Sequence, residues 1–71
     1  MAEDPVKFQL NGQSQEAPGP LSVGALLERF DLQGRRVAVA INTRVVPKSQ
    51  FASAEVREGD RVEVIQAVGG G

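Results

Sequence analysis

The C-terminal run Val68-Gly69-Gly70-Gly71 is the part of this sequence best suited to take part in chemistry. Consecutive glycines contribute nothing to a core, and each is costly to order in a regular element, by roughly 0.5–1 kcal/mol. A segment without Cβ atoms can instead lie extended in a narrow cleft and carry a terminal carboxylate to a buried site. From Val68 to Gly71 such a tail reaches about 13 Å, at ~3.3 Å per residue.

The carboxylate of Gly71 must be activated before it can react with a nucleophile. Its ordinary pKa is about 3.3–3.7, so at pH 7 it is an anion that repels nucleophiles. An acyl-adenylate would supply a leaving group, and a sulfur donor could then convert the chain end to a thiocarboxylate. The chain has no cysteine, so the sulfur must come from a partner. A run of glycines is also typical of a frayed end or a cloning scar, and the motif gains weight only at the terminus of a suitable fold.

The side-chain composition excludes most other chemistry. The absence of Cys and His removes thiol nucleophiles, imidazole bases, disulfides and the usual zinc ligands, so we expect no metal site. A net charge of -1 with scattered cations gives no reason to expect nucleic acid. No apolar run approaches the ~20 residues of a membrane helix, and the acidic start at Met1–Pro5 does not resemble a signal peptide. We therefore expect a cytoplasmic protein that is not an enzyme and is acted on by partners.

The N-terminal residues predict a β-hairpin. Val6, Phe8 and Leu10 alternate with polar residues, which is the period of a half-buried strand. Asn11-Gly12 follows, and both residue types tolerate the positive φ of a two-residue hairpin turn. The polar return strand, Gln13 to Ala17, suits an edge position and ends before Pro18-Gly19-Pro20.

A short amphipathic helix follows the hairpin. Ser22 can accept hydrogen bonds from the free amides of the first turn. Leu21 and Leu26 have the spacing of a hydrophobic staple across this helix start. The apolar residues after Ser22 recur at i, i+3, i+4 and i+7 and form one stripe of about two turns: Val23, Leu26, Leu27 and Phe30. Gly24 within the helix weakens it by about 1 kcal/mol relative to Ala, so packing must hold it.

The second half of the chain predicts a second hairpin. Val37 to Ile41 reads as a strand, Asn42-Thr43 as a turn, and Arg44 to Val46 as a short strand stopped by Pro47. Lys48 to Ala54 reads as irregular structure or a short helical turn. The sequence therefore predicts one β-hairpin before the helix and a second one after it.

Residues Glu58 to Asp60 form a predicted turn into the last strand, Arg61 to Ala67. The order strand–strand–helix–strand–strand–strand lets the first and last strands lie parallel, with the helix as crossover. The expected fold is α+β, a ubiquitin-like β-grasp: a mixed five-stranded sheet with one main helix. We expect one domain over residues 1–71, with residues 1–5 disordered and residues 69–71 forming a flexible reactive tail.

Strand alternation separates a core face from an open face of this sheet. The positions expected to be most buried are Val6, Phe8, Leu10, Leu26, Leu27, Phe30, Val39, Ile41, Val62 and Val64. Ala38, Ala40, Glu63 and Ile65 then lie on the uncovered face, where the alanines make a flat surface beside an apolar Ile65. Because the same strand runs into the tail, we expect partners to dock on Ala38, Ala40, Ile65 and Val68.

The chain resembles the ThiS family, the sulfur carriers of thiamin biosynthesis, from about Val6 to Gly71. Shared features include Asn11-Gly12, Leu26-Leu27, the Gly59-Asp60 turn and the terminal Gly-Gly. The most specific match is Val39-Ala40-Ile41-Asn42 followed by Val45-Val46-Pro47. Gly69 is a departure, because the family commonly has Ala before the Gly pair.

This resemblance implies a C-terminal thiocarboxylate on Gly71. An adenylating enzyme of the ubiquitin-activating type would use ATP on Gly71, a sulfur donor such as a persulfide enzyme would supply sulfur, and a thiazole synthase would accept it. No cofactor would be bound by the chain itself. The alternatives are a small subunit of molybdopterin synthase, a sulfur carrier for another pathway, a protein modifier, or a β-grasp binding module with an incidental tail. The chain lacks the aromatic and Pro-rich approach to the tail that is typical of the molybdopterin proteins.

Overall fold

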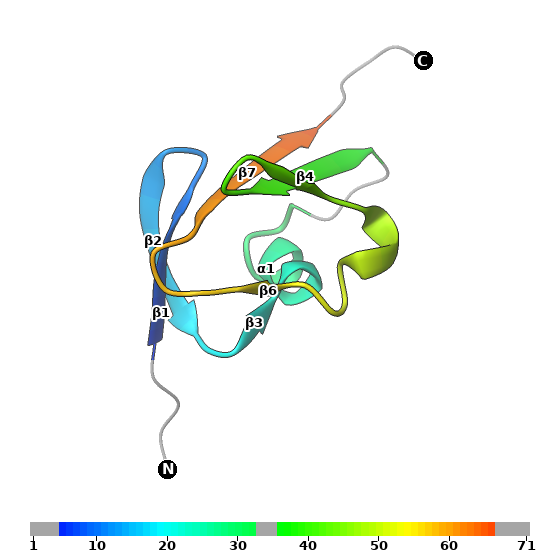
Figure 1. Cartoon of the computed structure of the whole chain (residues 1–71). Coiled ribbons are helices and arrows are strands. Elements are labelled where there is room, and N and C mark those ends of the chain that lie inside the picture. Colours follow the sequence, from blue (N-terminus) through cyan, green and yellow to red (C-terminus); the bar gives the residue numbers. More distant parts are fainter. Residues whose placement is uncertain (1–4, 33–35, 67–71) are drawn as a thin grey trace.

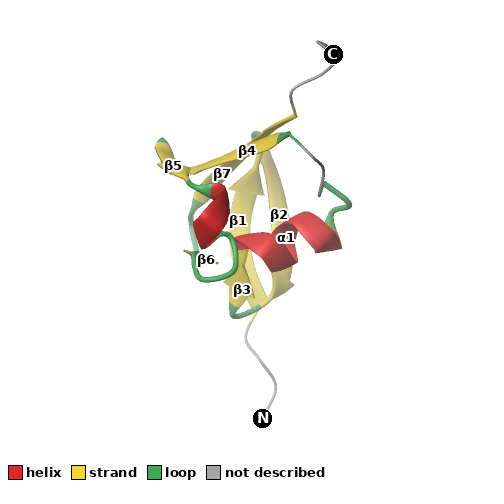
Figure 2. Ribbon diagram, turned by 90° about the vertical axis from the view of Figure 1, so that its right-hand side faces the viewer, coloured by secondary structure: helices red, strands yellow, loops and turns green. Residues whose placement is uncertain are grey.

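A mixed five-stranded sheet carries one helix across one of its faces (Figures 1 and 2). The computed structural model describes residues 5–32 and 36–66. In the sheet the strands lie in the order β2-β1-β7-β4-β5. Their bounds are β1 Pro5–Leu10, β2 Gln13–Pro18, β4 Val37–Ile41, β5 Arg44–Val46 and β7 Arg61–Gln66. This architecture confirms the predicted α+β, ubiquitin-like β-grasp fold.

The first hairpin has the predicted turn. Asn11 and Gly12 have φ values of 51° and 84°, so both central residues are left-handed, as a two-residue turn between twisted strands requires. Leu10 lies opposite Gln13 across the turn. Pro5 had been assigned to a disordered N-terminal segment, and this was wrong: it is the first residue of β1 and lies opposite Pro18. Proline is tolerated there because a strand's first residue need not donate to the ladder.

Helix α1, Val23–Arg29, begins where the sequence predicts. The Ser22 hydroxyl oxygen accepts a 3.0 Å hydrogen bond from the Ala25 amide, which satisfies one free donor of the first turn. The helix ends one residue before Phe30, whose ring instead meets Phe8 edge to face at 6.1 Å. The end is fixed by Asp31, which takes a left-handed φ of 57°.

Two short strands were missed by the sequence patterns. β3, Leu21–Ser22, and β6, Glu55–Val56, pair antiparallel in a small second sheet beside the helix start. Each has only two residues, which is too short for an alternation pattern to appear. Between β5 and β6 the 3-10 helix η1, Lys48–Gln50, confirms the expected short helical turn.

The core lies between α1 and one face of the sheet. Its buried members are Phe8, Leu10, Ala17, Leu21, Val23, Leu26, Leu27, Val37, Val39, Val56, Val62 and Val64. Val6, Phe30 and Ile41 were expected among the most buried positions but are only partly buried. Val6 and Ile41 lie near the ends of their strands, and Phe30 lies just past the end of α1. Leu21 and Val56 take such places instead, through the small second sheet.

Strand β7 lies in the middle of the sheet. On one side it pairs with β1 in parallel, with Gln9 beside Arg61 and Leu10 beside Val62. On the other side it pairs antiparallel with the whole length of β4, from Ile41 opposite Val62 to Val37 opposite Gln66. The predicted parallel contact between first and last strands is confirmed, and the strand that leads to the glycine run is the central one.

Candidate functional site

The predicted reactive residues Gly70 and Gly71, with Val68 and the expected flexible segment 69–71, lie outside the described residues. The last described residue is Gln66, at the end of β7. Gly71 is five positions further along the sequence, a span of at most about 18 Å when extended. The geometry that bears on the chain end is therefore that of β7 and its neighbours.

Alternation along β7 sends its side chains to opposite faces of the sheet. Val62 and Val64 are buried beneath α1, whereas Glu63 and Ile65 are exposed on the other face. The core residues therefore fix the position of the strand while its remaining side chains stay accessible. One strand thus combines an anchor, an accessible surface and the approach to the glycine run.

Two asparagines at hairpin turns hold β7 from opposite sides. Asn11 directly follows β1 and bonds to the second half of β7: its Oδ1 accepts from the Val64 amide at 2.8 Å, and its Nδ2 donates to the Val64 carbonyl at 3.3 Å. Asn42 directly follows β4 and bonds to the first half of β7, where its Oδ1 accepts from the Arg61 amide at 3.0 Å. Its Nδ2 donates to Asp60 Oδ1, also at 3.0 Å.

Sequence reasoning assigned both asparagines only a turn role. Each does have the left-handed backbone of a turn, with φ of 51° in both cases. Their carboxamides, however, contact residues 53 and 19 positions away in the sequence. A spacing of this kind follows from strand order, so no local pattern could have revealed it.

The uncovered face of the sheet carries a small apolar patch. It contains the exposed side chains of Ile65 (66% exposed) and Val45 (76% exposed), which are the two large exposed hydrophobic residues of the described chain. Ala38 lies directly opposite Ile65, and Ala40 lies between Val45 and Glu63 in the paired strands. We call Ala38, Ala40, Val45 and Ile65 the open-face patch.

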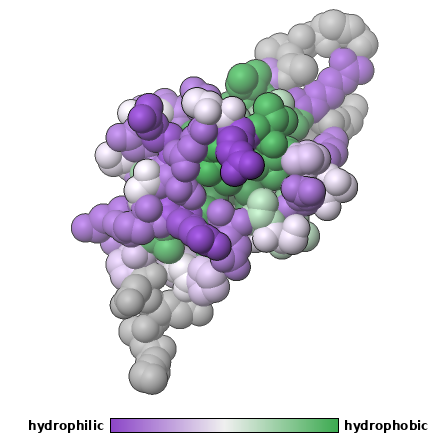
Figure 3. All heavy atoms as spheres, in the orientation of Figure 1, coloured by the Kyte–Doolittle hydropathy of each residue, from purple (hydrophilic) through white to green (hydrophobic). Residues whose placement is uncertain are grey.

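The open-face patch includes three of the predicted docking residues and adds one. Ala38, Ala40 and Ile65 share the face that strand parity predicts. Val45 was not foreseen, because a three-residue strand does not reveal which of its side chains faces the core. In Figure 3 hydrophobic side chains gather over the region of β4 and β5, while hydrophilic ones dominate on the side of β1 and β2.

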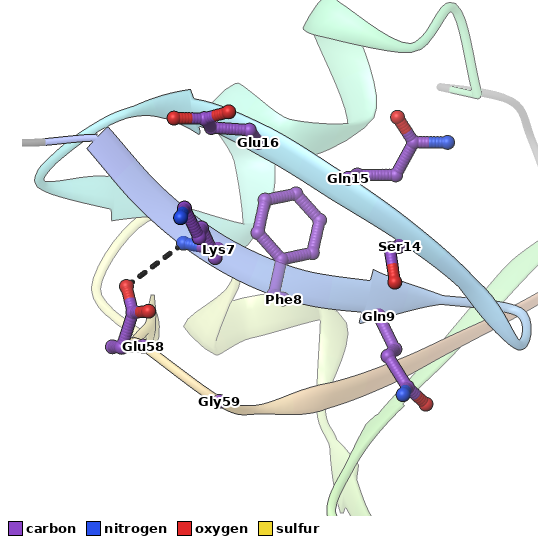
Figure 4. A pocket seen from close by; sticks show the side chains of 8 residues that line it. All are labelled: Lys7, Phe8, Gln9, Ser14, Gln15, Glu16, Glu58 and Gly59. Atoms are coloured by element: carbon purple, nitrogen blue, oxygen red, sulfur yellow. Dashed lines mark hydrogen bonds between the residues drawn. The ribbon is translucent and has the colours of Figure 1, made fainter.

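Hollows on the surface have both polar and apolar linings. The hollow in Figure 4, of about 620 Å³, lies along β1 and β2, where the Lys7 backbone amide donates to Glu58 Oε1 at 2.9 Å. A second, of about 340 Å³, lies between the two hairpin turns and is lined in part by Thr43 and Arg61. Neither of these two contains a residue of the open-face patch, but a third hollow, of about 380 Å³, is lined in part by Val45.

Residues 5–32 and 36–66 contain no group of three His, Cys, Asp or Glu side chains that could hold a metal ion. Among the helices described, none is long and apolar enough to cross a membrane.

The sheet order, the single helix across one face and the central last strand define a ubiquitin-like β-grasp protein. The sequence profile of the ThiS family matches residues 8–71. The chain therefore belongs to the ThiS family, whose members include small sulfur carriers of thiamin biosynthesis.

Individual relatives agree with this assignment. The sulfur carrier protein ThiS of Escherichia coli is 34% identical over 66 residues, which cover 93% of this chain and 100% of that protein. The crystal structure of the thiamine biosynthesis protein ThiS from Geobacter metallireducens superimposes with a TM-score of 0.80 at 30% identity, covering 93% of this chain and 100% of that one.

A thiazole synthase from Paramagnetospirillum magneticum is also similar, with 36% identity over 66 residues. Here the match covers 93% of this chain but 20% of the relative. The chain thus spans about a fifth of that protein's length, and almost the whole length of the carrier proteins.

Proposed function

We propose that this protein is a sulfur carrier whose Gly71 carboxylate is adenylated and then converted to a thiocarboxylate, which donates sulfur for thiazole formation in thiamin biosynthesis. The observation that carries the proposal is that the family match runs through the terminal Gly-Gly, to residue 71. Because the match includes these glycines, it favours the interpretation that they belong to the family's own sequence over a cloning scar or an incidental tail.

The chemistry follows from the nature of a carboxylate. Reaction of Gly71 with ATP in a partner enzyme of the ubiquitin-activating type forms an acyl-adenylate and releases pyrophosphate. Sulfur from a persulfide donor then attacks the acyl carbon and AMP leaves. A thiol cleaves the acyl disulfide that results and leaves the thiocarboxylate. The protein is a co-substrate in this scheme, binds no cofactor itself, and works in the cytoplasm.

The proposed acceptor is a thiazole synthase. Support comes from the relative that carries this name and contains a stretch similar to the present chain over a fifth of its length. When a carrier-like stretch and the remainder of such a protein share one polypeptide, they are held at high effective concentration. A separate carrier must achieve the same proximity by binding.

The open-face patch is the proposed docking surface for both partners. Ile65 and Val45 are apolar, exposed and on the face of the sheet that the helix does not cover. The strand that carries Ile65 leads to the glycine run. A partner that grips this face would hold the chain a short span from the carboxylate it must modify. Flat neighbours at Ala38 and Ala40 allow close approach.

The decisive test is the mass of the intact protein after incubation with ATP, the activating enzyme and a sulfur donor. We expect a mass increase equal to the exchange of one oxygen for sulfur, located on the C-terminal residue by fragmentation. Deleting Gly71, or adding one residue after it, should abolish adenylation and leave the circular dichroism spectrum and thermal midpoint unchanged. Undiminished ATP–pyrophosphate exchange with the extended chain would refute the proposed function.

A further inference from the structure

Strand β7 is longer than its neighbour β1 on the side that leads to the chain end. The parallel pairing ends at Leu10 beside Val62, and the chain then turns away at Asn11-Gly12. Strand β7 continues for four more residues, to Gln66, supported on its other side by β4. On the β1 side, the second half of β7 therefore has no backbone partner from β1.

The side chain of Asn11 takes the place of a backbone partner for one residue of β7, Val64. A carboxamide carries one acceptor and one donor group in a plane, like a peptide unit. The Asn11 backbone amide donates to the Val62 carbonyl at 2.8 Å, and its side chain then bonds to both the amide and the carbonyl of Val64. The β1–β7 ladder is thereby extended by one residue without any further strand.

We infer that Asn11 is a positioning residue for the reaction of the chain end. This inference rests on the proposed function. Without the carboxamide, β7 beyond Val62 is held from β4 alone, and two-stranded ribbons have larger and more variable twist than strands held on both sides. Asn11 thus fixes the direction in which β7 delivers the residues that follow Gln66.

This direction matters for turnover more than for binding. The open-face patch remains intact when Asn11 is changed, so a partner still binds. What changes is the fraction of bound molecules in which the carboxylate meets ATP in a reactive geometry. Misplacement of a reacting group by about 1 Å can cost two orders of magnitude in rate.

Asn42 supplies a matched control within the same molecule. It has the same residue type, the same φ of 51°, a hairpin turn, and side-chain and backbone bonds to β7. These bonds fall on Arg61, at the start of the strand rather than near its end. Removing either carboxamide costs β7 hydrogen bonds, but only the loss of Asn11 leaves the end that leads to Gly71 held from β4 alone.

The test compares Asn11→Gly with Asn42→Gly in the full chain, with the activating enzyme and ATP–pyrophosphate exchange as readout. Glycine accepts the left-handed turn geometry at both positions. For Asn11→Gly we expect kcat to fall by roughly tenfold and KM to change by less than about twofold, the pattern of a lost positioning effect. For Asn42→Gly we expect both constants to stay near those of the parent chain.

Hydrogen exchange provides a readout that does not depend on activity. The Val64 amide should exchange faster in Asn11→Gly, and the Arg61 amide should exchange faster in Asn42→Gly. The Val62 amide should stay protected in both variants. Asn11→Asp keeps the acceptor for the Val64 amide and the Asp-Gly turn. It loses the donor to the Val64 carbonyl, so its kcat should lie between those of the parent chain and Asn11→Gly.

The outcomes separate the inference from the proposed function. A parent chain that is not adenylated overturns the proposed function. A parent chain that is adenylated, with an unchanged kcat in Asn11→Gly despite rapid Val64 exchange, overturns the positioning role alone. The role is also overturned if KM rises with kcat unchanged, or if Asn42→Gly lowers kcat to the same extent. Should Asn11→Gly fail to fold, Asn11→Asp decides by the same criteria.

Discussion

At the scale of single residues, two glycines in the described chain differ in their backbone conformation and therefore in how well each position would accept a Cβ. Gly59 has a φ of +83° in the turn before β7, and no atom lies within 4 Å of the place a Cβ would occupy. Its constraint is the left-handed backbone alone. Gly24 lies inside α1 with ordinary helical geometry, and a Cβ there would be 3.5 Å from the Phe51 carbonyl oxygen, a normal contact distance.

Alanine should therefore have opposite effects at these positions. Gly59→Ala is expected to lower the free energy of unfolding by about 1–2 kcal/mol, because a Cβ is strained in the left-handed region. Gly24→Ala is expected to raise it by about 0.5–1 kcal/mol, through helix propensity. Urea denaturation measures both, and each variant serves as the control for the other. A stabilised Gly59→Ala would show that the turn can adopt another conformation at little cost.

At the scale of elements, α1 depends on its packing rather than on its intrinsic helicity. It has only seven residues, fewer than an isolated helix needs for stability in water, and it includes Gly24. Leu26 is fully buried and among the largest buried side chains of the core. The helix therefore forms because its apolar side chains pack against the sheet.

Truncating Leu26 should accordingly destabilise the whole domain. Leu26→Ala is expected to cost about 2–5 kcal/mol, the usual range for a leucine deleted from a packed core. Glu28→Ala, on the exposed side of the same helix, is the matched control and should change stability by less than about 0.5 kcal/mol. Thermal and urea melts would measure both. Equal stability of the two variants would mean that α1 does not pack on the sheet through Leu26.

Much of this fold could be predicted from local patterns. Alternation between Val6 and Leu10 and the Asn11-Gly12 turn identify the first hairpin, because hairpin geometry depends on adjacent residues. The helix start at Ser22 is similarly local. The parallel pairing of the first and last strands also followed, because a helical crossover favours it. The burial of Val62 and the exposure of Ile65 then follow from strand parity.

The features that could not be predicted depend on contacts distant in sequence. β3 and β6 are strands only because Leu21 meets Val56 beside the helix start. Ile41 has the same apolar character as Val39 and falls on the same face, yet it is the last residue of β4 and is only partly buried. The hydrogen bonds from the Asn11 side chain to Val64 could be predicted only by knowing that β7 extends beyond the end of β1. Each of these depends on lengths and positions in the assembled sheet rather than on residue type.

At the scale of the whole molecule, the sheet has one covered face and one open face. One face packs on α1 and forms the core, while the other carries the open-face patch with no described element over it. Ile65 stands on the same strand as the buried Val64 but contributes little to the core, since it is mostly exposed. Changes to the patch should therefore affect partners without unfolding the protein.

Ile65→Asp tests this separation. It is expected to weaken binding to the activating enzyme, to the thiazole synthase, or to both, by well over about 1 kcal/mol, as the loss of an interface anchor does. Its thermal midpoint should stay near that of the parent chain. Ser14→Asp on β2 adds the same charge to the same face at a distance from β7, and should bind normally. Calorimetric titration measures the affinities, and unchanged affinity of Ile65→Asp for both partners would place docking on another surface.

The central place of β7 also has a mechanical consequence. A partner that draws the glycine run into its cleft pulls along the axis of β7. The hydrogen bonds to β4 run nearly perpendicular to that axis, and β1 adds bonds on the other side. Such a pull loads these bonds together in shear, whereas a pull on an edge strand from the side would open them one after another. Under the proposed function, partner enzymes could thus put the chain end under tension while the domain behind it stays folded.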